Sequence, residues 1–74
     1  MRKIEVGIYK HFKGNKYQVL FIGKDSETLK KVVVYQALYG ENDIWIRDYE
    51  MFNSLVDKIK YPNAAQEYRF ERIG

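Results

Sequence analysis

The sequence predicts an all-β fold, a small five-stranded SH3-like barrel with one short helical turn near residues 49–53. Short segments rich in β-branched and aromatic residues recur along the 74 residues and are separated by polar turns. The three consecutive valines at 32–34 disfavour a helix, because branched side chains lose rotamer freedom there. Closure into a barrel would also remove exposed strand edges. We therefore expect residues 1–74 to form a single SH3-like domain.

The first two strands are expected at 4–8 and 17–22. Apolar residues occupy every second position of 4–8, which is typical of a half-buried strand. The segment 17–22 (YQVLFI) is almost entirely apolar or aromatic, and it suits a central strand. The polar, glycine-containing stretch 13–16 predicts a turn between them.

The third and fourth strands are expected to form a hairpin. Residues 31–39 (KVVVYQALY) have the strongest β pattern in the chain, and 44–47 resume it. The four polar residues between them, 40–43, match a four-residue hairpin loop. A polar connection over 23–30 leads into this hairpin.

The last third of the chain is less regular. Asp48 is a good N-cap for one helical turn, because its carboxylate can accept hydrogen bonds from the free backbone N–H groups of a first turn. Two alternatives remain open for 55–59, either a continuation of the helix or a short strand. The Tyr61-Pro62-Asn63 sequence ends both. Residues 68–73 (YRFERI) alternate and predict the last strand.

Composition excludes several classes of site. The chain has no cysteine, so it cannot hold disulfides or thiolate zinc sites. His11 is the only histidine, and no carboxylates are spaced with it as metal ligands, so no metal or cofactor is expected. Thirteen basic and ten acidic residues give a net charge of +3, which permits a polyanionic partner. No signal peptide or membrane-length apolar run is present, which predicts a cytoplasmic protein without membrane association.

Six short motifs occur in a fixed order between residues 7 and 70. They are Gly7-x-Tyr9-x-His11-Phe12-Lys13-Gly14-x-x-Tyr17-x-Val19, Ser26-Glu27-Thr28, Val34-Tyr35-x-x-Leu38-Tyr39-Gly40, Trp45-Ile46-Arg47, Met51-Phe52 and Arg69-Phe70. With these motifs the chain resembles the bacterial family called domain of unknown function 1653. Each motif alone is weak, but their joint order and spacing make the resemblance specific.

The resemblance implies a small SH3-like β-barrel and no particular reaction. The chain departs from the family pattern at two places. Asp48 stands where members usually have proline, which favours a polar helix cap over a rigid turn. The segment 60–68 also looks longer than usual, so the approach to the last strand is not defined by the resemblance.

The first candidate site combines Tyr9, His11, Lys13 and Tyr17. Odd-numbered residues of an extended strand share one face, so the first three would point the same way. A titratable imidazole between an aromatic ring and a cation could line a pocket for an anion or a base. The alternative is a solvated strand end, with Tyr9 in the core and His11 hydrogen-bonded at its rim.

The second candidate is the polar triplet Ser26, Glu27 and Thr28. These side chains can bind a ligand, but Ser and Thr hydroxyls also commonly bind backbone amides in turns. Both roles remain open.

The third candidate is an aromatic patch of Tyr35, Tyr39, Trp45 and Arg47. If the hairpin register aligns the two strand faces, rings and a guanidinium would form one surface able to stack bases or bind a peptide. The alternative is a core tryptophan, with Arg47 paired to a carboxylate.

These candidates predict a non-enzymatic binding module with an aromatic and basic surface, whose ligand is a nucleic acid or a nucleotide-like molecule. A peptide or protein interaction module is the alternative, and it predicts acidic flanks such as Glu41 and Asp43. A third hypothesis is a small enzyme using His11 and Glu27, which requires a deep pocket with His11 close to a carboxylate. No catalytic residue is assigned.

Overall fold

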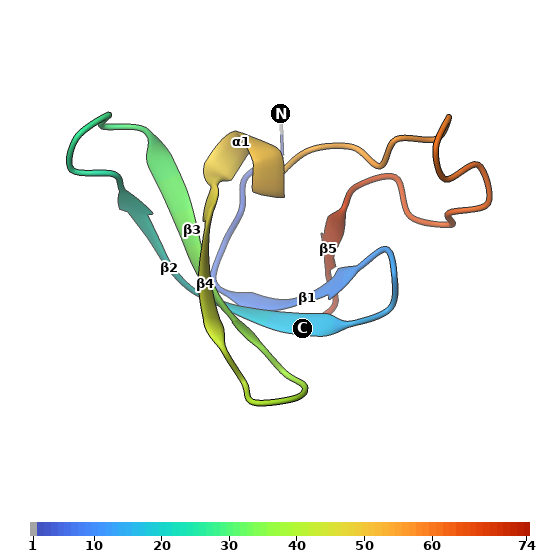
Figure 1. Cartoon of the computed structure of the whole chain (residues 1–74), viewed down its shortest axis with the longest axis horizontal. Helices are drawn as coiled ribbons and strands as arrows, with labels where there is room; N and C mark the ends of the chain where they lie inside the picture. Colours follow the sequence, from blue (N-terminus) through green and yellow to red (C-terminus); the bar gives the residue numbers. More distant parts are fainter. Residues whose placement is uncertain (1) are drawn as a thin grey trace.

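The computed structural model describes residues 2–74, and these form one antiparallel sheet with a single helical turn (Figure 1). The elements are β1 (Gly7–His11), β2 (Lys16–Lys24), β3 (Lys31–Ala37), β4 (Ile44–Asp48), α1 (Tyr49–Phe52) and β5 (Phe70–Arg72). The strand order is β4-β3-β2-β1-β5. The predicted all-β class, the five strands and the helical turn are therefore confirmed.

The sheet is curled but open, so the expected closure into a barrel is wrong. Strands β4 and β5 lie at its two edges and do not pair with each other in the described part of the chain. Strand β5 has only three residues. Arg2 donates a hydrogen bond from its side chain to the Phe70 carbonyl oxygen at 2.7 Å. A side chain thus binds the backbone group that β4 would have to reach for closure.

Strand β1 begins three residues later than the alternating pattern at 4–8 predicted. Ile4 is buried in the core, but Val6 is exposed, and the paired strand starts at Gly7. Gly7 has a φ of +152°, and a Cβ there would lie 2.6 Å from Arg72 Nε and 2.7 Å from the Gly74 carbonyl oxygen. Close packing of the C-terminal segment against this backbone therefore sets the start of β1.

Residues 53–69 form an excursion that is neither of the two predicted alternatives. Asp48 caps α1 as expected, since its Oδ1 accepts the N–H groups of Glu50 and Met51, but the helix ends at Phe52. The chain then returns on itself: Val56 donates its N–H to the Glu67 carbonyl at 2.7 Å. Long-range pairing of this kind replaces the local helical pattern.

The core lies between the concave face of the sheet and α1, and it is mainly aromatic. The rings of Phe52 and Phe70 stack with centroids 4.0 Å apart, and Tyr9 meets Phe52 edge-on at 5.6 Å. Each buried ring removes about 150–250 Å² from water, which substitutes for the disulfides that this chain lacks. The core cluster comprises Ile4, Tyr9, Val19, Val33, Tyr35, Tyr49, Phe52 and Phe70.

Candidate functional site: a basic hollow beside a tyrosine cluster

Tyr9 belongs to the core. Its side chain is buried, and its hydroxyl donates to the Glu5 carbonyl at 2.9 Å and accepts the Glu5 N–H at 3.0 Å. Both hydrogen bonds fasten the segment before β1 to the sheet. Tyr9 thus has the structural role that the sequence left open as an alternative.

His11 lies at the end of β1, half-buried between aromatic rings. It meets Phe70 edge-on at 4.9 Å, and its Nδ1 accepts the N–H of Lys13 at 3.1 Å. Burial lowers the pKa of His11 below its ordinary 6.5, and the charges of Lys13, Arg47 and Arg69 lower it further. The imidazole is therefore neutral at pH 7, in strongly positive surroundings.

Four of the predicted residues meet on the concave face, and we refer to Tyr17, Tyr35, Tyr39 and Arg47 as the tyrosine cluster. The ring of Tyr17 lies 5.5 Å from those of Tyr35 and Tyr39, and the hydroxyls of Tyr17 and Tyr39 are 2.7 Å apart. Arg47 donates from Nε to the Tyr35 hydroxyl at 3.2 Å. Burial, followed by the hydrogen bond with Tyr39, raises the pKa of Tyr17 to about 12.

Trp45 is not the core residue that the alternative interpretation expected. It pairs with Tyr35 in the register of β3 and β4, but its side chain is 49% exposed, because β4 is an edge strand. Among residues 2–74 Arg47 forms no salt bridge either; its Nε donates to the Tyr35 hydroxyl, and its guanidinium lies 5.9 Å from the Phe70 ring centroid. Trp45 thus lies at the margin of the cluster rather than within it.

The Ser26-Glu27-Thr28 triplet lies elsewhere, in the β2–β3 connection. Asp25 Oδ1 accepts the N–H groups of Glu27 at 2.8 Å and Thr28 at 3.1 Å, which also lowers the pKa of Asp25. Thr28 Oγ1 accepts the N–H of Lys30 at 3.3 Å. Figure 1 shows this connection at the opposite end of the molecule from the 53–69 excursion. The triplet thus forms a turn, and the structure does not bring Glu27 to His11.

The structure shows a site that the sequence did not predict, where the 53–69 excursion meets the end of β1. A hollow of about 290 Å³, which we call the basic hollow, opens there. A second hollow of about 380 Å³ adjoins it. The basic hollow is lined by His11, Phe12, Lys13, Asp57, Lys60, Tyr61 and Arg69.

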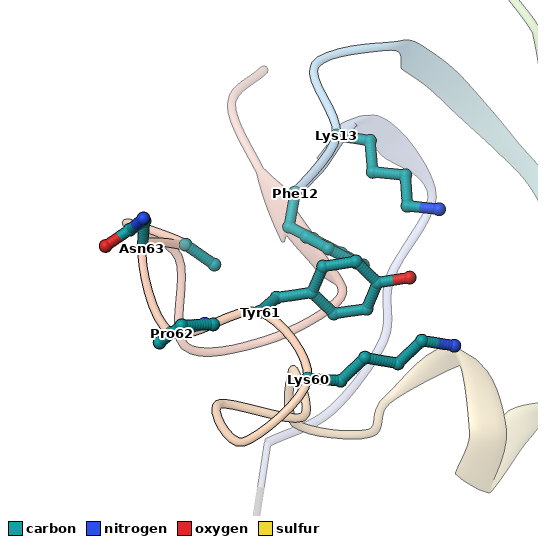
Figure 2. Close-up of a pocket in the computed structure, with 7 residues that line it drawn as sticks. Phe12, Lys13, Lys60, Tyr61, Pro62 and Asn63 are labelled. Atoms are coloured by element: carbon teal, nitrogen blue, oxygen red, sulfur yellow. The ribbon is translucent and has the colours of Figure 1, made fainter.

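Tyr61 lines both hollows, together with Phe12, Lys13 and Lys60. Its ring meets Phe12 edge-on at 4.9 Å, and the ammonium nitrogens of Lys13 and Lys60 lie 5.2 Å and 5.6 Å from its centroid. Figure 2 shows the two lysine side chains on either side of the ring, with both ammonium groups toward the phenol oxygen. Hydrogen bonding with Lys13, followed by the charges of Lys13 and Lys60, lowers the pKa of Tyr61.

Positive charge in the basic hollow is not balanced by carboxylates. Within residues 2–74 the one salt bridge joins Arg72 to Glu5, at 3.6 Å, away from the hollow. Asp57 lines the hollow, but its Oδ1 accepts the N–H groups of Ile59 at 3.0 Å and Lys60 at 3.2 Å. The hollow therefore presents three cationic side chains to one carboxylate that already binds backbone.

The other lysines near the β1–β2 turn face away from the aromatic residues. Lys10 and Lys16 are register partners, and they alternate with the Tyr9 and Tyr17 pair, which faces the core. They therefore lie on the outer face of the sheet. Of these turn lysines, Lys13 alone joins the hollow.

Comparison with known proteins decides the family. The model of the family described as Protein of unknown function (DUF1653) matches residues 7–72. The chain belongs to the DUF1653 family. The resemblance seen in the sequence is thus confirmed.

A solved structure of the DUF1653 family is also similar to this chain. It is the crystal structure of a member from Bordetella bronchiseptica, with 32% sequence identity and a TM-score of 0.82, and the match covers 100% of this chain and 92% of that one. A search of curated proteins finds no match. The DUF1653 description names no function.

Between residues 2 and 74, no three His, Cys, Asp or Glu side chains group as a metal site. No helix in that range has the length and hydropathy to span a membrane. Ammonium and guanidinium groups beside aromatic rings can bind a phosphate attached to a planar group.

Proposed function

We propose that the protein is a non-enzymatic binding module for single-stranded nucleic acid, with a phosphate in the basic hollow and a base against Tyr61. The observation that supports this most directly is the convergence of Lys13, Lys60 and Arg69 around aromatic rings without a matching set of carboxylates.

The cations supply the phosphate contacts. Lysine ammonium groups bind phosphate as point charges, and arginine can bind it through two parallel N–H groups. His11 is neutral at pH 7, so its remaining ring nitrogen adds a hydrogen-bonding group without charge. A hollow of about 290 Å³ has the volume of a small ligand site.

The aromatic rings supply the base contacts. Proteins that bind single strands without strong sequence preference combine a positive groove with rings on which bases stack. Tyr61 and Phe12 line both hollows, so a base in the neighbouring hollow would lie next to a phosphate in the basic hollow. The tyrosine cluster continues this surface through His11, whose ring centroid is 6.4 Å from that of Tyr17.

The charge of the hollow favours nucleic acid over the peptide alternative. A module for proline-rich peptides was expected to carry acidic flanks, and Glu41 and Asp43 were the candidates. They lie in the β3–β4 connection and do not line either hollow.

A cytoplasmic location remains a prediction, which cell fractionation would test.

The test is the fluorescence anisotropy of labelled single-stranded DNA and RNA of about eight nucleotides, within the usual site size of such modules. We expect saturable binding. Tyr61→Leu should weaken it between about fivefold and about 150-fold, the equivalent of about 1–3 kcal/mol for one stacked base. Phe21→Leu is the matched control, because Phe21 is an exposed ring on the outer face. Absence of saturable binding, or equal loss in the control, would overturn the proposal.

A further inference from the structure

The free edge of β4 is apolar over residues 44–46, and its charged residues, Arg47 and Asp48, stand at the far end of the strand. Ile44 and Ile46 are 60% and 70% exposed, and Trp45 lies between them. Natural proteins usually blunt an exposed edge with lysine, proline or a bulge, because an unprotected edge pairs with another strand. None of these occurs over residues 44–46, and the pairing of β4 with β3 is regular.

The hydrogen bonds between β3 and β4 determine which backbone groups of β4 point away from the sheet. Ala37 donates its N–H to the Asp43 carbonyl at 2.9 Å, so Asp43 faces β3. Backbone groups alternate in direction along an antiparallel strand, so Trp45 and Arg47 also face β3. The N–H and C=O groups of Ile44 and Ile46 therefore point outward from the sheet.

An apolar row on the outer face runs up to the same edge. The register places Phe21 beside Val34, and Val34 beside Ile46, across β2, β3 and β4. Phe21 is 67% exposed, and the row ends at Ile46 on the free edge. A strand added there would extend the row and cover part of it.

We propose that β4 pairs antiparallel with β4 of a second copy of this chain, with the two-fold axis at Ile46. The outward N–H and C=O groups of Ile46 then bond to those of Ile46 in the second copy. The apolar row continues from one copy into the next, and the two sheets become one.

The side chains of β4 are complementary to those of β4 in a second copy of the chain. In this register Trp45 lies opposite Arg47 of the second copy, as a non-hydrogen-bonded pair whose side chains are close. Contacts between indole and guanidinium are among the favourable cation–π pairs. In the same register Asp48 lies opposite Ile44 of the second copy, so neither Arg47 nor Asp48 lies directly opposite a like charge.

The pairing does not use the residues of the basic hollow. The hollow is built from the end of β1 and the 53–69 excursion, whereas the pairing uses β4, in which Arg47 also belongs to the tyrosine cluster. An interface of one strand pair lies at or below the lower size limit of about 1,200 Å² for stable complexes. We therefore expect a weak dimer, with a dissociation constant between about 10 μM and about 1 mM.

Sedimentation equilibrium tests the dimer, over protein concentrations from about 10 μM to about 1 mM. The wild-type mass should rise from 8.9 kDa toward twice that value. Ile46→Lys should remain at 8.9 kDa, because it places two like charges on the axis. Ile59→Lys makes the same change at a side chain that is 95% exposed in the excursion, and it should dimerise as wild type does.

Opposite charges introduced at position 46 test whether the two-fold axis of the dimer lies at Ile46. Since residue 46 faces itself, Ile46→Lys and Ile46→Glu should each be monomeric, and an equimolar mixture should regain the dimer. Trp45 emission should shift to the blue as the dimer forms, because half-exposed Trp45 becomes covered. A wild-type mass of 8.9 kDa throughout, undiminished dimerisation of Ile46→Lys, or a monomeric mixture would each overturn the proposal.

Discussion

The salt dependence of nucleic-acid binding gives a quantitative test of the basic hollow. Each phosphate neutralised on a single strand contributes about −0.7 to the slope of log K against log salt. Lys13, Lys60 and Arg69 line the hollow. If each of them neutralises one of three successive phosphates, one of which lies in the hollow, the slope is about −2.1. Raising salt from about 50 mM to about 200 mM should therefore weaken binding about 18-fold. In Lys60→Ala two contacts remain, so the slope becomes about −1.4 and the loss about sevenfold.

The assay is anisotropy of a labelled oligonucleotide at four or more salt concentrations. Lys24→Ala serves as the control, because it removes the same charge at the far end of β2, next to the β2–β3 connection. The control should keep the wild-type slope. An unchanged slope in Lys60→Ala, or an equal change in Lys24→Ala, would show that the hollow does not hold the phosphate.

Three further predictions concern the fold. Phe52→Ala should lower the free energy of unfolding, measured by urea denaturation, by about 3–5 kcal/mol, because the ring is fully buried. Met51→Ala is the control, and it should change that free energy by less than about 1 kcal/mol, because Met51 is exposed. Tyr49→Phe removes the hydroxyl that accepts the Ile4 N–H at 2.8 Å. It should lower the free energy of unfolding by about 1–3 kcal/mol and speed hydrogen exchange at the Ile4 amide. An unchanged exchange rate at that amide would contradict this role. His11 should titrate by NMR below its ordinary 6.5. Since the folded state then binds this proton less readily than the unfolded state, stability should fall as pH decreases from 6.5 through the lowered pKa, and His11→Gln should flatten this dependence.

Local chemistry was enough to predict most of the strands. The valine run of β3 and the Asp48 cap act over a few residues, so their structure could be predicted without knowing the rest of the chain. The apolar spacing after α1 suggested that the helix could continue through 55–59, but Leu55 pairs with Tyr68 instead. Closure failed for a similar reason, since a side chain near the N-terminus binds the free edge of β5. Contacts between distant segments leave no local periodic signal.

The candidate site was predicted only in part. The spacing of β1 and the adjoining turn singled out His11 and Lys13, which line the hollow. Of the predicted aromatic patch, Tyr35, Tyr39 and Arg47 lie together, but with Tyr17 and not with Trp45. Lys60, Tyr61 and Arg69 were missed because they come from the irregular excursion. The available signal was the Lys60-Tyr61 pair, a cation next to an aromatic ring, but its partner Phe12 lies 49 positions earlier in the chain.

The hydrogen bonds between the first and last segments of the chain have a consequence during protein synthesis. Ile73 donates its N–H to the Ile8 carbonyl at 2.8 Å, and Arg2 binds the Phe70 carbonyl. While a ribosome is still making the excursion, Phe52 has no stacking partner, and one side of β1 is unpaired. The nascent chain therefore exposes an aromatic surface and a strand edge until β5 emerges. This late pairing delays folding, and the exposed surface promotes association with other chains. A pause in translation before Phe70 would prolong that exposure.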